Sequence, residues 1–554
     1  MTSTPAAPPA PVQPLSPGTS AQISALFANA VEAHRTAGIT WAIVGGHDHA
    51  QEVLATGGAG HHRLEGGVPA PGSPAIGPGS ISRIASMTKS FTAASVLRLR
   101  DEGALRLDDP IAQHVPEATA IAAATPDSPE ITVRDLLTMS AGLVTDNPWG
   151  DRQEAMTRED FARMLAEGLG HVHAPGTGFE YSNTGYALLG RLIDEVSGTG
   201  YDEYVRTHFL APLGMGDSAF RPDDLDPARI ATGHRLGDRE DATRFEPVEL
   251  DRPGVYGAMA GIYSTTADIA RWVRFLAAAD APDAAERSQD LLRTASRREM
   301  QQLHRIQQTA PLPPVAPAGG ADGAAAAGPG ATTSEGAAPA AGAGGTQALG
   351  AAPAGEPVSP GFDRVRGYGF GLVIERFPDL GGVVSHSGGY PGYGSFMVWH
   401  RDSGLGVVAL ANSKYAPASS LAMEALRLIR RLQPELLAPR GRIAAPRTLE
   451  AAQAALAWLS APEDSAADAW FADNMDLDTS REERLRRRDA ALGACGLGLE
   501  AIEGLTPAGA QVLSRAALRW TVPGTVEGTS LRVDLEMDPR STALIQTLET
   551  RALR

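Results

Sequence analysis

The order of apolar and polar positions in the first hundred residues predicts a helix, a hairpin and a second helix. Apolar side chains recur first at helical spacing, two apolar runs then flank a glycine-containing turn, and a short strand leads into the second helix. The predicted elements are a helix over residues 23–31 closed by Gly38, strands Ile39–Val44 and Glu52–Thr56, a loop over 57–80, a strand Ser82–Ala85 and a helix from about Met87 to Glu102.

Further along, helical patterns dominate and then give way to strands. Helical spacing runs from Val133 to about Leu276, interrupted by loops that contain Pro and Gly. Four apolar or alternating runs follow between glycine turns, which is typical of consecutive antiparallel strands. These runs are Tyr368–Arg376, Gly382–His386, Gly394–His400 and Gly406–Ala411, and a helix at about Pro417–Leu432 comes after them, with Pro in its first turn.

The chain of 554 residues is too long for one hydrophobic core. Changes in composition along the chain indicate where it divides into domains. Residues 1–18 predict a disordered leader, and the Ala-, Gly- and Pro-rich stretch of about 310–360 predicts a disordered insertion in a main domain over 19–435. Residues 440–554 predict a small α+β domain, with a charged helix at Arg481–Leu492 and strands at Ala517–Val522 and Ser530–Met537. We expect Arg481–Arg488 to form one solvated helix face, or else a partner-binding face.

Composition narrows the classes of function. Forty-eight basic residues stand against 65 acidic ones, a net charge of -17, which excludes a typical nucleic-acid partner. The single cysteine, Cys495, allows no intrachain disulfide. Because neither a signal peptide nor an apolar run of eighteen residues is found, we predict a cytoplasmic protein without a membrane partner. The partner expected is a small-molecule or peptide substrate, and the oligomeric state stays open.

Lysine is scarce, which draws attention to one motif. Lys89 and Lys414 are the only lysines among the 48 basic residues, so the other 46 are arginines. Lys89 follows Ser86 by three positions at the start of a predicted helix, where the two side chains share a face. A lysine desolvated in a cleft can take a proton from a serine, and an arginine cannot. This pair predicts a serine nucleophile with its base.

Two further motifs come later in the chain. Tyr181 and Asn183 form a Y-x-N pattern, which supplies a phenol that can shuttle protons and an amide that can donate hydrogen bonds. His386, Ser387 and Gly388 form a weaker H-x-G pattern. Other candidates are set aside: His47 and His49, and likewise His171 and His173, lack a further metal-binding motif, so we interpret them as exposed loop histidines. Neither a P-loop nor a G-x-S-x-G elbow is found.

The order S-x-x-K, Y-x-N and H-x-G closely resembles that of the serine β-lactamase-related hydrolases. This family includes class C β-lactamases, D-Ala-D-Ala carboxypeptidases, D-aminopeptidases and esterases. The resemblance spans about residues 20–435 and extends to the flanking segments Arg83–Ala93, Asp108–Pro110, Ile131–Leu137, Pro212–Met215 and His386–Gly392. It implies an α+β fold: a β-lactamase/transpeptidase-like antiparallel sheet flanked by helices, with a largely helical subdomain over about 105–250 that carries Tyr181.

The resemblance also implies a role for each motif residue. Ser86 would be the acylated nucleophile, Lys89 its base, and Tyr181 the phenol that relays protons to the leaving group. Asn183 would hold the substrate or Lys89. His386, Gly388 and Gly389 would line the substrate site, and the backbone N–H groups of Ser86 and Gly389 would form the oxyanion hole. Neither a metal nor an organic cofactor is implied.

The chain departs from the family pattern at two places. The usual K-T-G is His386-Ser387-Gly388 here, a form found more among peptidase- and esterase-like members. The usual H-T-S-G-L is Met139-Ser140-Ala141-Gly142-Leu143, which puts the hydrogen bond of the lost histidine in doubt.

A structural interpretation of each motif remains open. Ser86 could be a helix N-cap beside a surface Lys89, Tyr181 and Asn183 could belong to an ordinary loop and turn, His386 could be a packed strand residue, and Gly389 could serve a tight turn.

Two hypotheses about function follow. The first is a serine hydrolase that acts through a Ser86 acyl-enzyme on a small ester, an amide or a peptide that contains D-amino acids. β-Lactamase or D-Ala-D-Ala carboxypeptidase activity is the alternative within this class. The second hypothesis is a non-catalytic descendant in which the fold and the tail serve binding.

Overall fold

A computed structural model describes residues 14–237, 241, 243–249, 252–281, 291–307, 365–414, 416–438 and 443–553 of the protein. The chain divides into two compact units, Met1–Ala438 and Pro439–Arg554. The predicted insertion over about 310–360 and most of the predicted leader lie outside the described residues. Helix α1 (Pro17–Glu32) begins inside the predicted leader, because the Ser16 hydroxyl accepts a hydrogen bond from the Thr19 N–H at 3.1 Å and caps it.

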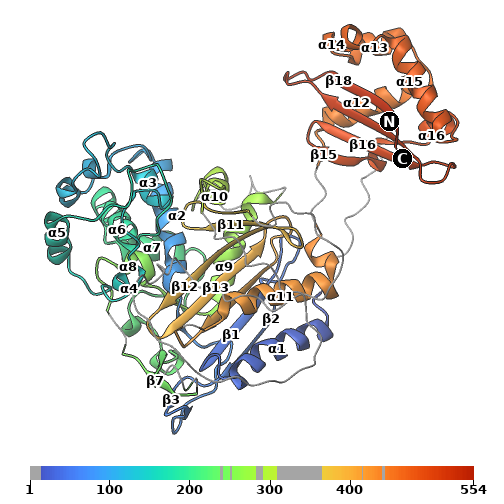
Figure 1. The fold of residues 1–554 in the computed structure, drawn as a ribbon. Helices are drawn as coiled ribbons and strands as arrows, with labels where there is room; N and C mark the ends of the chain where they lie inside the picture. Colours follow the sequence, from blue (N-terminus) through green and yellow to red (C-terminus); the bar gives the residue numbers. More distant parts are fainter. Residues whose placement is uncertain are drawn as a thin grey trace, which may run out of the picture. The chain divides into compact units, whose positions relative to one another are not determined.

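An eight-stranded antiparallel sheet forms the centre of the described part of the first unit (Figure 1). Its order is β2-β1-β14-β13-β12-β11-β10-β9, so the first strand of the chain pairs with the last strand of the unit. The strands are β1 (Gly38–Val44), β2 (Val53–Gly60), β9 (Arg305–Ile306), β10 (Val365–Tyr368), β11 (Val373–Phe377), β12 (Gly381–Tyr390), β13 (Tyr393–His400) and β14 (Gly406–Ala411).

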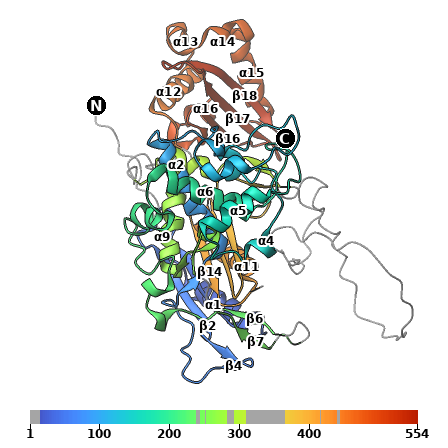
Figure 2. The same ribbon diagram turned by 90° about the vertical axis from the view of Figure 1, so that its left-hand side faces the viewer.

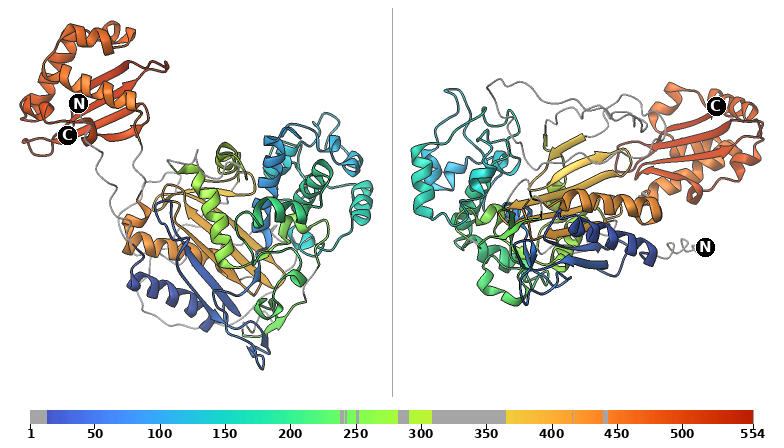
Figure 3. Two further views of the ribbon diagram at one scale, coloured as in Figure 1. Left: turned by 180° about the vertical axis from the view of Figure 1, so that it is seen from behind. Right: turned by 60° about the horizontal axis from the view of Figure 1, so that its bottom comes forward.

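Helices cover both faces of this sheet, which explains why β13 and β14 are buried along their whole length. Side chains alternate between the faces of a strand. Val398 and Val407 pack with α1 and α11 (Ala418–Leu432), which lie side by side in Figure 3. Trp399 and Val408 pack in the core that includes α2 (Thr88–Asp101) and α9 (Thr266–Ala277).

The helical subdomain follows α2 in the sequence and packs against it (Figure 2). Helix α2 contacts α6 and α8 and is buried on nearly all sides. The subdomain contains α3 (Val133–Leu137), α4 (Asn147–Gly150), α5 (Arg158–Glu167), α6 (Asn183–Ser197), α7 (Tyr201–Val205) and α8 (Gly257–Ala260). The sequence prediction of a mainly helical stretch after residue 133 is confirmed.

Several predicted boundaries were wrong for local reasons. Gly38 begins β1 and does not close the first helix. The run Tyr368–Arg376 is two strands and not one, because a turn at Gly371, with a left-handed φ of 66°, separates β10 from β11. The predicted loop after residue 57 contains the end of β2 and the short hairpin of β3 (Leu64–Glu65) and β4 (Val68–Pro69). Pro417 is at the N-cap position, one residue before α11, and not in the first turn of that helix as predicted.

The second unit is an α+β structure, as predicted for the tail. Its strands β15 (Gln511–Ser514), β16 (Ala517–Pro523), β17 (Ser530–Met537) and β18 (Ile545–Leu553) form one antiparallel sheet in that order. Apolar residues of one sheet face pack on helices in a separate core, which includes Leu518, Leu535 and Leu548 in one register row. The helices are α12 (Pro446–Ser460), α13 (Asp464–Trp470), α14 (Asp473–Asp478), α15 (Arg481–Ala494) and α16 (Glu500–Glu503).

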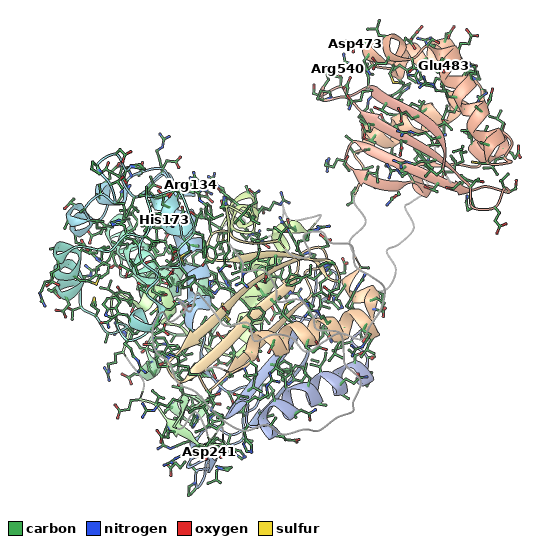
Figure 4. The ribbon with its side chains drawn as sticks, in the orientation of Figure 1. Arg134, His173, Asp241, Asp473, Glu483 and Arg540 are labelled. Carbon is green, nitrogen blue, oxygen red and sulfur yellow. The ribbon has the colours of Figure 1, made fainter. Side chains whose placement is uncertain are left out.

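Helix α15 corrects one expectation about the tail. Residues Arg481–Arg488 are not one solvated face, because the Arg484 and Arg488 side chains are buried. Arg484 donates to the carbonyl oxygen of Met475, and Arg488 donates to that of Leu459. The solvated part of this helix includes Glu483 (Figure 4), which pairs with two arginines.

Among the described residues, no helix has both the length and the apolar character needed to cross a bilayer.

Candidate active site

Ser86 lies in a short 3-10 turn, Ala85–Met87, immediately before α2. Ala85 has a left-handed φ of 48°, a conformation that costs a residue with a Cβ roughly 1–2 kcal/mol. Two hydrogen bonds hold Ile84, just before it: its N–H donates to the Ile262 carbonyl at 2.9 Å, and its carbonyl accepts from the Ser395 hydroxyl at 2.7 Å. Backbone strain of this kind persists where the surrounding structure enforces it, often at active sites.

The Lys89 side chain is fully buried beside Ser86. Its Nζ donates to Ser86 Oγ at 3.1 Å, to Asn183 Oδ1 at 2.7 Å and to the Met259 carbonyl at 3.1 Å. Burial lowers the pKa of Lys89 to about 7, although three nearby carboxylates, Asp146, Asp151 and Glu154, oppose the shift. The amine is therefore partly neutral at pH 7 and able to accept a proton, and the interpretation of Lys89 as a surface lysine is wrong.

Tyr181 joins the same cluster from the helical subdomain. An interaction with the Ser86 hydroxyl lowers the pKa of Tyr181, but burial outweighs it and raises that pKa above its usual value. The Lys89 ammonium lies 5.0 Å from the centroid of the Tyr181 ring. Ser86, Lys89 and Tyr181, separated by up to 95 positions in the chain, are thus brought together.

The N-terminus of α6 fixes Asn183. The Asp146 carboxylate accepts from the backbone N–H groups of Asn183 at 2.6 Å and Thr184 at 2.8 Å, which satisfies two free donors of the first helical turn. The Asn183 amide donates to Asn147 Oδ1 at 2.9 Å while its oxygen accepts from Lys89. Asn183 therefore holds Lys89. Asp146 and Asn147 were missed by sequence reasoning, although Asn147 is one of only five asparagines in the chain.

Met139 stands where the usual H-T-S-G-L pattern has its histidine, and it accepts two hydrogen bonds there. The Met139 carbonyl accepts from the Glu180 N–H at 2.8 Å, and its sulfur accepts from the Ser182 N–H at 3.4 Å. These two residues flank Tyr181 in the sequence. A thioether is a weak acceptor, yet it satisfies the donor at this buried place. Met139 also has a left-handed φ, of 58°.

His386 is buried on β12 and bonded at both ring nitrogens. Its Nδ1 donates to the Ser387 carbonyl at 2.6 Å, so its Nε2 accepts from the Tyr368 hydroxyl at 3.0 Å. Burial and the charge of Lys89 lower the pKa of His386 to about 3, so the ring is neutral at pH 7. The Tyr368 ring lies edge-on to Tyr181, with 6.4 Å between centroids, and this connects His386 to the cluster.

Gly388 and Gly389 differ in what surrounds them. A Cβ on Gly388 would lie 2.2 Å from the Ile84 carbonyl oxygen, so only glycine lets β12 approach the nucleophile turn this closely. A Cβ on Gly389 would meet open space, and the residue is exposed. Gly389 pairs with Gly394 in the β12–β13 ladder, so the tight turn is formed beyond it, at Gly392, which has a φ of 91°.

The other histidine candidates lie apart from this cluster. His47, His49, His171 and His173 are half-buried and not exposed as predicted. His171 forms an isolated β-bridge with Leu143, and the adjoining His173 is labelled in Figure 4. In the part of the chain that the structure describes, no three His, Cys, Asp or Glu residues gather in a way that could hold a metal ion.

Known proteins resemble this chain in sequence and in fold. It is 26% identical over 349 residues to penicillin-binding protein 4* of Bacillus subtilis, a match that covers 60% of this chain and 61% of that protein. The octameric penicillin-binding protein homologue of Pyrococcus abyssi has a TM-score of 0.54 at 21% identity and covers 96% of this chain and 99% of its own. D-amino acid amidase of Ochrobactrum anthropi has a TM-score of 0.51 at 21% identity, with coverages of 75% and 99%.

The family assignment follows from the profile that spans the site. The Beta-lactamase family profile matches residues 23–430, which include all the clustered residues described above. The chain spans about three fifths of the length of the B. subtilis relative and less of the staphylococcal relatives named protein flp, of which the match covers 38%. This chain belongs to the Beta-lactamase family of serine hydrolases.

Proposed function

We propose that the protein hydrolyses a small ester, an amide or a peptide containing D-amino acids through an acyl-enzyme on Ser86. The observation that carries this proposal is the buried Lys89 amine, 3.1 Å from the Ser86 hydroxyl and with a pKa lowered to about 7. A catalytic base works best when its pKa lies near the operating pH. A surface lysine, with a pKa near 10.4, would be almost fully charged at pH 7 and could not serve.

The reaction has two steps in which protons and bonds balance. Neutral Lys89 takes the Ser86 proton as the serine oxygen bonds to the substrate carbonyl carbon. The bond to the leaving group then breaks, and Tyr181 passes the proton held by Lys89 to the departing oxygen or nitrogen. In the second step neutral Lys89 takes a proton from the water that attacks the ester carbonyl. The bond from that carbonyl to the serine oxygen breaks, the acid product leaves, and Ser86 regains its proton from Lys89.

The oxyanion that forms in each step needs donors that are already in place. The backbone N–H groups of Ser86 and Gly389 are the pair that we propose. Gly389 is exposed, and β12 lies against the nucleophile turn through Gly388. Removal of one such donor costs about 10²–10³ in rate in known hydrolases, so this pair is expected to carry a large share of catalysis.

The third motif and one structural neighbour bear on the class of substrate. The H-S-G form at His386 favours ester, amide or D-amino-acid substrates over β-lactams, and a neutral His386 cannot supply the positive charge of the usual lysine. One structural neighbour is named as a D-amino acid amidase. A cytoplasmic location, which we also propose, would exclude cell-wall cross-links as substrates, and cell fractionation tests it.

A panel of hydrolysis assays tests the proposal. The full chain is incubated with p-nitrophenyl butyrate, D-phenylalanine amide, D-Ala-D-Ala dipeptides and a chromogenic cephalosporin, and intact mass detects an acyl adduct. We expect turnover of an ester or D-amino amide, no turnover by Ser86→Ala, and normal turnover by Ser95→Ala on the same helix. Absence of any adduct or turnover in the wild type would instead favour a non-catalytic binding protein.

A further inference from the structure

Arg83 is a buried charge that the proposed chemistry does not use. It ends β5 (Ser82–Arg83), three residues before Ser86, and its side chain is 1% exposed. Its Nη2 lies 2.8 Å from Glu154 Oε1, a carboxylate that is also fully buried. Its Nε donates to the Ala260 carbonyl at 3.0 Å. Its Cζ lies 3.8 Å from the centroid of the Tyr390 ring.

These contacts join segments that hold different parts of the site. Tyr390 follows Gly389 directly, at the end of β12. Ala260 follows Met259, whose carbonyl accepts from Lys89. Glu154 belongs to the helical subdomain, three residues after Asp151. One guanidinium therefore contacts the strand beyond Gly389, the segment beside Lys89 and the subdomain that carries Tyr181.

Stability alone gives a poor reason for this arrangement. Two charges removed from water cost more than their attraction returns unless the geometry is very good, and apolar residues of the same size often do as well. The arrangement does exploit properties that lysine lacks, since a planar guanidinium can pair with a carboxylate at its edge and stack on an aromatic ring with its face. The interaction with Glu154 raises the pKa of Arg83 despite its burial, so the charge is permanent.

This contact set adjoins both proposed donors of the oxyanion hole, Ser86 and Gly389. Donors of an oxyanion hole must lie about 2.7–3.1 Å from the oxygen, so a small movement of one strand reduces their effect. On one side, only two residues of the chain separate Arg83 from Ser86. On the other, its guanidinium presses against Tyr390, the residue after Gly389.

We infer that Arg83 is a positioning residue that sets the spacing between the Ser86 and Gly389 N–H groups. This inference rests on the proposed function. It requires that changes at Arg83 weaken the binding of the tetrahedral transition state and leave the binding of the substrate nearly unchanged. Arg83 itself contacts neither the substrate nor the reacting atoms.

Two variants test the two sides of this contact set. Arg83→Lys keeps the charge but loses the planar fork, and Tyr390→Leu removes the ring while Arg83 and Glu154 remain. Arg297→Lys is the matched control, because Arg297 is also fully buried, with its Cζ 4.6 Å from the Phe275 ring centroid. For each variant, kcat and KM are measured with p-nitrophenyl butyrate, and inhibition is measured with phenylboronic acid, which forms a tetrahedral adduct with an active serine.

We expect kcat to fall about 10- to 100-fold in Arg83→Lys and Tyr390→Leu while KM changes less than about threefold, because one whole donor is worth about 10²–10³. Boronate affinity should fall by the same factor as kcat/KM. Arg297→Lys should melt earlier but keep both values. If Arg83→Lys does not fold, Tyr390→Leu decides alone.

Two results would overturn the inference. Unchanged kcat and boronate affinity in a folded variant would leave Arg83 a structural role only, and a rise in KM at constant kcat would assign it to substrate binding. A wild-type protein that neither hydrolyses the ester nor binds the boronate would instead refute the proposed function.

Discussion

The cluster around Ser86 and the sheet of the tail differ in how far their charged side chains are exposed. Around Ser86, the side chains of Lys89, Arg83 and Glu154 are at most 1% exposed. On the tail sheet, Arg519 and Arg532 pair with Asp534 but remain about a quarter exposed, and Arg551 and Glu549 are about half exposed. Exposed pairs contribute only about 0–1 kcal/mol each. Buried ionisable groups with shifted pKa values are typical of functional sites, so this comparison favours the Ser86 cluster over the tail sheet as the candidate site.

Lys89→Arg should have the largest effect on the rate of hydrolysis. Arginine keeps the positive charge but cannot shed its proton, so a role as base is lost while an electrostatic role survives. We expect kcat to fall by about 10²–10⁴ with the fold retained. Hydrolysis of p-nitrophenyl butyrate and a circular dichroism melt check both parts. The other lysine offers the control: Lys414→Arg should keep its activity, and a Lys89→Arg variant as active as this control would remove Lys89 from the mechanism.

The cap of α6 gives the next largest effect. Asp146→Asn weakens the acceptor for the Asn183 and Thr184 N–H groups, so Asn183 and Tyr181 lose their fixed position. We expect a loss of about 1–2 kcal/mol in the free energy of unfolding and a fall of about tenfold or more in kcat/KM. Thr157→Ala removes the cap of α5, which lies away from the cluster, and should lower stability alone. Equal rates in the two variants would contradict a specific role for Asp146.

A smaller effect is expected in the pH profile of Asp151→Asn. The Asp151 carboxylate raises the pKa of Lys89, so its neutralisation lowers that pKa further. The acid limb of the rate profile should therefore move to lower pH, by less than about one unit, because a partly screened charge is worth about 1 kcal/mol. Burial raises the pKa of Asp151 itself to about 6, so the shift should fade below that pH. A movement of the acid limb to higher pH would contradict this prediction. Glu159→Gln, at an exposed position of α5, serves as the control.

The least effect is expected on the tail. Arg532→Ala removes one partner of Asp534, but Arg519 still pairs with that carboxylate at 2.6 Å. We expect the free energy of unfolding of the tail to change by less than about 1 kcal/mol. The rate of hydrolysis should not change. A fall in rate would show that the tail contributes to catalysis and would weaken the contrast between the units.

Sequence motifs identified the site residues that lie close to one another in the chain. Ser86 and Lys89 are three positions apart, and Tyr181 and Asn183 are two apart, so motifs could find them. Their partners in the structure come from distant segments: Met139 holds the backbone on either side of Tyr181, and Asp146 caps the helix that carries Asn183. No periodicity connects such pairs, because the contacts form only when the subdomain folds.

The same reason explains the errors in the fold. Predicted helices and strands such as α2, β13 and α11 are confirmed because their apolar periodicity reports burial along one element. The pairing of β1 with β14 joins strands about 370 positions apart, which share a core with α1 and α11, and it is not visible in any local window. The turn that splits β10 from β11 was missed because the apolar run continues through Gly371.

The pH dependence of covalent labelling shows whether Lys89 activates Ser86. A fluorophosphonate reacts with an activated serine whatever the natural substrate is, and peptide mapping identifies the labelled residue. We expect a label on Ser86 whose second-order rate constant rises with pH through an apparent pKa near 7 to a plateau. A rate that rises only near pH 10, or a label that persists in Ser86→Ala, would contradict it.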